Sequence, residues 1–258
     1  MNRAIYSSTS GGMAALARLD SVAQNLANVN TAGYKAERVI FRVRPLDDTS
    51  GGSTDPIVRE TGAQVDQVAT VRDFSQGAVR NSGNPLDVAI TGDGFFTVNT
   101  PRGERYTRQG NFSLDAEGFL VTAHGERVQG DGGDIQLGSS SGTGTGKGTG
   151  TAAIGEDGTV SLDGAPVGRL KVVSFGDKPQ LVAEGNSLFA PARGAAANPL
   201  DATATHLAPE SVEAANVDAV SGMIELVDVT RGFETYMRAI ERLDGITSRA
   251  INEVGRVP

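Results

Sequence analysis

The chain contains no cysteine and no tryptophan, and only two of its 258 residues are histidine. Without cysteine it can form no disulfide, no cysteine nucleophile and no thiolate metal site. His124 falls at a predicted hairpin tip and His206 in a predicted linker, so no H-E-x-x-H motif or histidine-rich metal site is possible. We therefore expect neither a metal nor another cofactor.

Long apolar runs are also missing. No segment approaches the roughly 20 apolar residues of a membrane span, and the first residues lack the apolar core of a cleaved signal peptide. The net charge of −8 does not favour binding to nucleic acid. The charge is uneven, because residues 1–44 carry a net +4 and residues 210–258 a net −4. We expect the two ends of the chain to attract and orient one another.

A glycine-rich tract at 138–153, GSSSGTGTGKGTGTAA, invites two enzymatic interpretations. Gly146 and Lys147 resemble the end of a phosphate-binding loop, but Gly148 stands where a Ser or Thr must hold Mg²⁺ and no helix follows. Residues 138–142 match G-x-S-x-G, but within low-complexity sequence rather than at a strand-to-helix turn. We interpret the tract as a flexible loop and expect no enzyme activity.

Apolar residues recur at alternating spacings of three and four near both ends of the chain, which predicts helices over 3–28 and 217–254. The second helix would be more than about 50 Å long, too long for a small core, so it needs a partner along its length. The first helix and other copies of the chain are the candidates. The two predicted stripes comprise Ile5, Gly12, Leu16, Leu19, Ala23 and Leu26, and Met223, Leu226, Thr230, Phe233, Met237, Ile240, Asp244, Thr247, Ile251 and Val254.

Short apolar runs from about 79 to 189 alternate with glycine-containing tips such as Arg102-Gly103 and Asp163-Gly164, which predicts antiparallel strands. The predicted fold class is α+β, with the terminal helices pairing as a coiled-coil-like core around an inserted, mainly antiparallel β domain. The predicted layout is a helical core domain at 1–44 and 210–258, an extended connector at 45–78, a β domain at 79–195 with a flexible loop at 138–151, and a return linker at 196–209.

The stretch QNLANVNTAGYKAER at 24–38 resembles the N-terminal signature of the flagellar rod, hook and hook-associated family. Blocks at 84–98 and 106–130 resemble β-domain motifs of rod and hook proteins, and 212–244 is similar to the C-terminal helix of the family. Within the family the chain looks like the proximal rod type more than the distal rod or hook type. It departs from the pattern at Gln24, where many relatives carry Asn, and in the 138–151 tract.

The resemblance implies a structural subunit of the proximal rod that polymerises into a helical tube and transmits torque. It also implies export through the flagellar type III apparatus without a cleaved signal peptide, and assembly within the periplasm. Implied partners are other copies of the chain and other rod proteins, with no nucleic acid and no small-molecule substrate. A distal rod or hook-type axial protein, a secreted coiled-coil oligomer of fixed size, and an enzyme with a dispersed site remain the alternatives.

The helix stripes and the family motifs together predict an assembly interface. We expect the Asn amides after the first helix to bond to a neighbouring subunit, or alternatively to cap their own helix. The glycine is expected to turn the chain, and the Tyr-Lys pair to lead outward to the β domain. The predicted interface residues are Leu16, Leu19, Asn25, Leu26, Asn28, Asn30, Gly33, Tyr34, Lys35, Met223, Leu226, Arg231, Phe233, Glu234, Met237 and Ile240.

Overall fold

A computed structural model describes residues 2–45, 63–138, 151–175, 181–191, 198–199 and 206–254. The chain divides into two compact units, and the fold class is α+β, as predicted. We call Met1–Ala27, Glu37–Asp73 and Asp218–Pro258 the helical unit, and Asn28–Ala36 with Phe74–Val217 the β unit. Among the described residues, no helix is long and apolar enough to cross a membrane.

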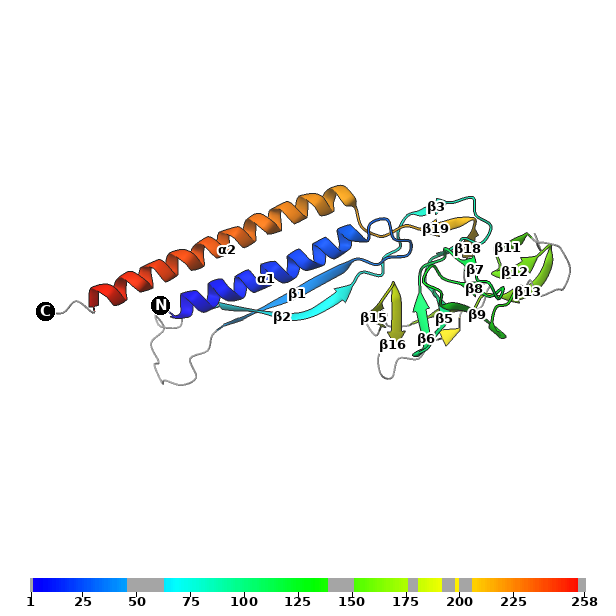
Figure 1. Ribbon diagram of the computed structural model, residues 1–258, viewed down its shortest axis with the longest axis horizontal. Coiled ribbons are helices and arrows are strands. Elements are labelled where there is room, and N and C mark those ends of the chain that lie inside the picture. The colour runs from blue at the N-terminus through cyan, green and yellow to red at the C-terminus, as the bar shows by residue number, and fades with distance from the viewer. Residues whose placement is uncertain are drawn as a thin grey trace. The chain divides into compact units, whose positions relative to one another are not determined.

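The helical unit contains α1 (Asn2–Ala27) and α2 (Ala219–Val254), which run side by side (Figure 1) and lie within two residues of the predicted bounds. The first turn of α2 is capped by Asp218. Its Oδ1 accepts a hydrogen bond from the backbone N–H of Val220, and its Oδ2 accepts from the backbone N–H and hydroxyl of Ser221. An Asp at this position stabilises the start of a helix, because the first backbone N–H groups lack partners within the helix.

A two-stranded ribbon lies beside α1 in the same unit (Figure 1). Strand β1 (Glu37–Pro45) pairs antiparallel with β2 (Ala63–Arg72), with a register irregularity between Ile40 and Phe41. The segment predicted as an extended connector, 45–78, contains β2, and its partner β1 lies almost wholly within the segment predicted as helical core, 1–44. The expected polar loop at 49–54 lies outside the described residues.

The β unit is built around one large sheet, and every strand pairing in the described part of the chain is antiparallel. Its central order is β15-β16-β6-β5-β9-β8-β7, with β10 on β9, β14 on β5 and β17 on β14. The strands are β5 (Phe95–Thr100), β6 (Gly103–Thr107), β7 (Ser113–Leu114), β8 (Leu120–Val121), β9 (Arg127–Gly130), β10 (Gly133–Asp134), β14 (Val172–Ser174), β15 (Leu181–Gly185), β16 (Leu188–Pro191) and β17 (Asn198–Pro199).

Three smaller sheets complete this unit. One contains β11 (Ala152–Ile154), β12 (Thr159–Leu162) and β13 (Ala165–Arg169). The others pair β4 (Val88–Thr91) with β18 (His206–Pro209), and β3 (Val79–Asn81) with β19 (Ser211–Glu213). The return linker predicted at 196–209 thus contains β17 and β18. Most of the predicted loop at 138–151 lies outside the described residues.

Two apolar clusters form the core of the β unit. In the smaller one, aromatic rings meet edge to face, with the Phe95 and Phe189 centroids 5.8 Å apart. The predicted hairpin tips are confirmed where the backbone needs glycine: φ is +100° at Gly103 and +82° at Gly164. The larger cluster includes Val88, Ile90, Phe96, Val98, Phe112, Leu120, Val128, Val160, Leu170, Leu188 and Leu207.

Candidate assembly interface

The two helices meet through small and polar residues rather than through the predicted apolar stripes. Arg18 on α1 donates from Nη2 to Oε1 of Glu225 on α2 at 2.6 Å. Gly11 lies against the ring of Tyr236, and a Cβ at Gly11 would be 2.6 Å from the Tyr236 Cε1 atom. Val229 is buried on the same side of α2. The contact stripe of α2 therefore follows Gly222, Glu225, Val229 and Tyr236, whereas Gly232 lines the adjoining groove and has nothing within 4 Å of a Cβ built there.

On α2 the contact stripe is displaced by one residue from the predicted stripe, whereas on α1 Leu26 of the predicted stripe lies beside Gly222. Three residues of the predicted stripes are exposed in the single chain: Leu16 is 45% exposed, Met223 56% and Met237 42%. The absence of a side chain at Gly11 makes room for the Tyr236 ring against α1. A coiled-coil geometry is not established by these contacts.

An open groove of about 590 Å³ lies within the helical unit, between α1 and α2 and beside Phe41 of β1. Its walls are mostly apolar, with Arg18, Glu225 and Asp228 adding charge. Ile224 lies at the rim and is largely exposed. The lining residues are Gly11, Ala14, Ala15, Arg18, Phe41, Ser221, Ile224, Glu225, Asp228, Val229, Gly232 and Tyr236.

The first two turns of α2 also expose an apolar surface. Val220, Met223, Ile224 and Val227 are each about half to two-thirds exposed, and we call them the outer stripe. At 3.6 residues per turn, their positions fall on the side of α2 opposite the contact stripe. A run of exposed large apolar residues indicates a surface that another molecule covers.

The other predicted helix residues lie in mixed surroundings. Leu19, Leu26, Leu226, Phe233 and Ile240 are half-buried. Arg231 and Glu234 are exposed, and Glu234 accepts a hydrogen bond from Arg238 one turn later, at 3.2 Å. An exposed pair of this kind contributes little to stability, so it does not by itself identify a contact surface.

The predicted Asn residues contact their own chain. The Asn25 side chain bonds to Glu37 at two points: Nδ2 donates to the Glu37 carbonyl and Oδ1 accepts from the Glu37 N–H, both at 2.8 Å. Asn28 Oδ1 accepts from the Thr31 hydroxyl at 3.2 Å. Asn30 is exposed. Asn25 therefore fixes the start of β1 against α1, and of the three it is Asn30 that leaves its side chain at the surface.

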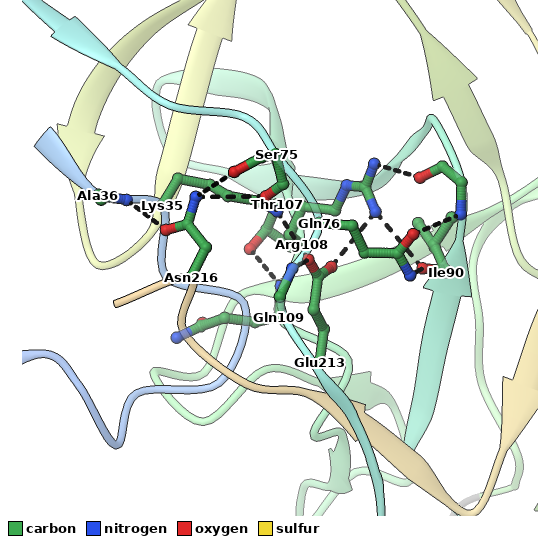
Figure 2. Close-up of polar contacts among 12 residues, drawn as sticks. Lys35, Ala36, Ser75, Gln76, Ile90, Thr107, Arg108, Gln109, Glu213 and Asn216 are labelled. Carbon is green, nitrogen blue, oxygen red and sulfur yellow. Dashed lines mark hydrogen bonds and ion pairs between the residues drawn. The ribbon is translucent and has the colours of Figure 1, made fainter. Parts of the chain in front are cut away.

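Gly33, Tyr34 and Lys35 are buried inside the β unit, the part of the chain toward which the Tyr-Lys pair was predicted to lead. Lys35 is only 1% exposed, and its Nζ donates to Oε1 of Glu213 at 2.6 Å and to the Ser75 carbonyl at 2.8 Å. Figure 2 shows these contacts converging from segments far apart in the sequence.

A second buried cation shares the same carboxylate. Arg108 Nη1 donates to Oε2 of Glu213 at 3.2 Å, and Nη2 donates to the Gly92 carbonyl at 2.6 Å (Figure 2). Burial lowers the pKa of Arg108, while the negative charges of Glu213 and Asp93 oppose that shift. Because a buried charge is tolerated only when it is compensated, Glu213 is central to this site.

Sequence reasoning missed both Glu213 and Arg108. Glu213 lies in ESVEAAN, where two glutamates and a serine are typical of an exposed strand. Arg108 lies in the resembling block 106–130 but carried no predicted role. No local signal distinguishes them, because their burial depends on distant partners: Glu213 pairs with Lys35, 178 residues away, and Arg108 pairs with Glu213, 105 residues away.

Beyond this cluster, the described residues contain no group of three His, Asp or Glu side chains that could hold a metal ion. The exposed apolar residues of the helical unit favour a role in protein contacts.

Comparison with known proteins gives three family matches in chain order. Residues 5–35 match the model described as "Flagella basal body rod protein", 89–162 the "Flagellar hook protein FlgE/F/G D1 domain", and 208–253 the "Flagellar basal body rod FlgEFG protein C-terminal". The matches include α1, much of the β unit and almost all of α2.

Curated relatives align over nearly the full length of the chain. The flagellar basal-body rod protein FlgF of Caulobacter vibrioides is 32% identical over 265 residues, covering 100% of both chains. FlgF of Mesorhizobium japonicum is 31% identical, covering 99% of each. FlgG of Bacillus subtilis is 31% identical, covering 98% of this chain and 99% of the relative. The chain belongs to the family of flagellar basal-body rod proteins, and its resemblance includes the FlgF type.

Proposed function

We propose that this chain is a structural subunit of the proximal rod of a bacterial flagellar basal body. It polymerises through its terminal helices with other copies and with other rod proteins, and the resulting helical tube transmits torque. The observation that carries this proposal is the exposed apolar surface on α1 and α2, in a chain whose relatives are rod proteins.

The outer stripe supports polymerisation because its four apolar side chains are each about half to two-thirds exposed. Exposed apolar surface that becomes buried contributes roughly 25 cal/mol per Å², and several such side chains on one helix supply a substantial driving force. On α1, Met13 and Leu16 are also exposed. The groove between the helices provides a concave surface for a neighbouring copy, with its acidic and basic side chains setting orientation.

The same proposal includes export through the flagellar type III apparatus without a cleaved signal peptide and assembly in the periplasm. The absence of cysteine is compatible with it, because no disulfide has to be opened before the chain is threaded. Apolar helix faces that are covered only by neighbours provide a physical reason for the helices to gain stability on assembly.

A substitution in the outer stripe tests the proposal. Met223→Glu places a charge on an exposed position, so the isolated chain should fold, whereas burial of that charge in a polymer is unfavourable. We expect incorporation into purified basal bodies to fall about tenfold to 100-fold, with loss of swimming in cells that carry only the variant.

The matched control is Val182→Glu, which introduces the same charge at a similarly exposed apolar position on β15 in the β unit. Incorporation of Met223→Glu at the parent level would overturn the proposed surface. If Val182→Glu lowered incorporation equally, any added charge would be harmful. The result for Met223→Glu would then no longer support assembly through the helices.

Hydrogen exchange on the purified chain at low concentration tests the assembly step. We expect α1 and α2 to exchange faster than the strands of the β unit in the monomer, and to become protected on polymerisation. Strong protection of both ends in a closed oligomer of fixed size would instead favour the secreted coiled-coil alternative.

A further inference from the structure

One carboxylate, that of Glu213, compensates two cations in the interior of the β unit. The Glu213 side chain is fully buried, and the Lys35 and Arg108 side chains are 1% and 2% exposed. Glu213 Oε1 accepts from Lys35 Nζ at 2.6 Å and from the backbone N–H of Gly77 at 2.8 Å, while Oε2 accepts from Arg108 at 3.2 Å (Figure 2). Both oxygens are therefore engaged.

These three charges come from distant parts of the chain. Lys35 follows α1, Arg108 follows β6, and Glu213 ends β19, at separations of 178 and 105 residues from its two cations. The carboxylate thus belongs to the last segment of the β unit, whereas both cations precede it by more than a hundred residues.

The segment that carries Glu213 contributes more than its charge. Strand β18 pairs with β4, and its Leu207 completes the larger apolar core. The Glu213 carbonyl accepts from the N–H of Gly33 at 2.7 Å. Asn216 accepts from the N–H of Ala36 at 2.7 Å and donates to the Ser75 carbonyl at 3.2 Å. Residues 206–216 therefore hold the segment after α1 and the segment after β2 in place.

Before that segment docks, a closed β unit would bury Lys35 and Arg108 without the carboxylate that both contact. Leaving buried charges without their partner is strongly unfavourable, more so than lacking a neutral hydrogen bond. Asp93 also favours the charged form of Arg108, but it is exposed and therefore a weaker partner.

We propose that Glu213 is a closing residue: the β unit remains open until residues 206–216 dock and bring the carboxylate to its two cations. Folding of this unit is then conditional on a segment near its C-terminal boundary, and a partly delivered chain stays unfolded. The benefit for export rests on the proposed rod function, whereas the folding dependence itself does not.

Amide hydrogen exchange on full-length variants tests the closing role. Glu213→Gln keeps the size of the side chain and an acceptor for Gly77, but removes the charge. We expect exchange across β4, β5 and β6 to accelerate about 100-fold to 1,000-fold, because the whole unit opens. The matched control Glu210→Gln removes an exposed carboxylate three residues earlier and should leave exchange unchanged.

Two further variants distinguish a closing role from general damage. Lys35→Met leaves the Glu213–Arg108 pair in place, so we expect less than about tenfold acceleration. The double variant, Glu213→Gln with Lys35→Met, also removes one of the two cations. We expect its amides to exchange at least about tenfold more slowly than those of Glu213→Gln alone.

Two results would overturn the inference. One is that amide exchange in Glu213→Gln accelerates only in residues 31–36 and 206–216, which would mean that Glu213 stabilises only its immediate surroundings. The other is a double variant that is no better than Glu213→Gln. Failure of the rod proposal would be a separate result. The parent chain would then fold, with a protected β unit, but would not be incorporated into basal bodies.

Discussion

Replacing Gly33 with alanine tests how tightly the turn after α1 is fitted into the β unit. Gly33 has a φ of +65°, and its N–H donates to the Glu213 carbonyl at 2.7 Å. An alanine Cβ at this position would lie 2.4 Å from the backbone carbonyl carbon of Arg108 and 2.5 Å from its oxygen. The substitution therefore meets both an unfavourable conformation and a backbone overlap.

The two effects have separate magnitudes. A non-glycine residue in the left-handed region costs about 1–2 kcal/mol. Relief of the overlap requires movement of backbone rather than of a flexible side chain, and overpacking of this kind costs about 1–3 kcal/mol. The expected loss in free energy of unfolding is therefore about 2–5 kcal/mol, a large part of the stability of a domain.

Gly83→Ala separates the two effects. Gly83 has nearly the same φ, +72°, but no atom lies within 4 Å of a Cβ built there. This control should lose only the conformational part, about 1–2 kcal/mol. The loss in free energy of unfolding can be measured for both variants by urea unfolding, monitored by circular dichroism, and by amide exchange in β5 and β6. Equal losses in the two variants would refute the fit between Gly33 and the Arg108 backbone.

Two further predictions concern the helical unit. Gly11→Ala should lower the thermal midpoint followed by far-ultraviolet circular dichroism, because the new Cβ displaces the Tyr236 ring, whereas Gly245→Ala, with open space around it, should raise the midpoint. The hydrogen bonds from Ser221 lower the pKa of Asp218 from its ordinary 3.8. Its stabilisation of the start of α2 is present above that value and lost as the pH falls through the depressed pKa. Amide exchange of the first turn should therefore show an acid step that is missing in Asp218→Ala.

Helix positions and fold class could be predicted because they depend on local periodicity and turn chemistry. The helix bounds agree to within two residues, and Gly103 and Gly164 turn where expected. The face along which the helices meet could not be predicted, because periodicity identifies the most apolar stripe without identifying what covers it. Met223 and Met237 fit the predicted stripe, yet they are exposed, and the contact follows Gly222 and Tyr236.

The role of the charged residues depended on partners far away in the sequence. Lys35 belongs to a motif that resembles the family signature, but nothing near it indicates a fully buried side chain. Its environment is set by Glu213, and that contact exists only after the chain has folded. Asn25 was expected to bond to a neighbouring subunit or to cap its own helix, and its side chain bonds instead to the backbone of Glu37 in the same chain.

The unequal lengths of the helices give the pair a direction. Gly11 lies against Tyr236 and Leu26 is near Gly222, so the start of α1 at Asn2 faces a point near residue 245 of α2. Since α2 continues to Val254, about nine residues, or roughly 14 Å, extend past the first helix, beginning with the exposed Ile246. One end of the pair carries the connections to the β unit and the other carries this overhang. A fibre of such subunits, as the proposed function requires, has two unlike ends, so growth at one tip is chemically distinct from growth at the other.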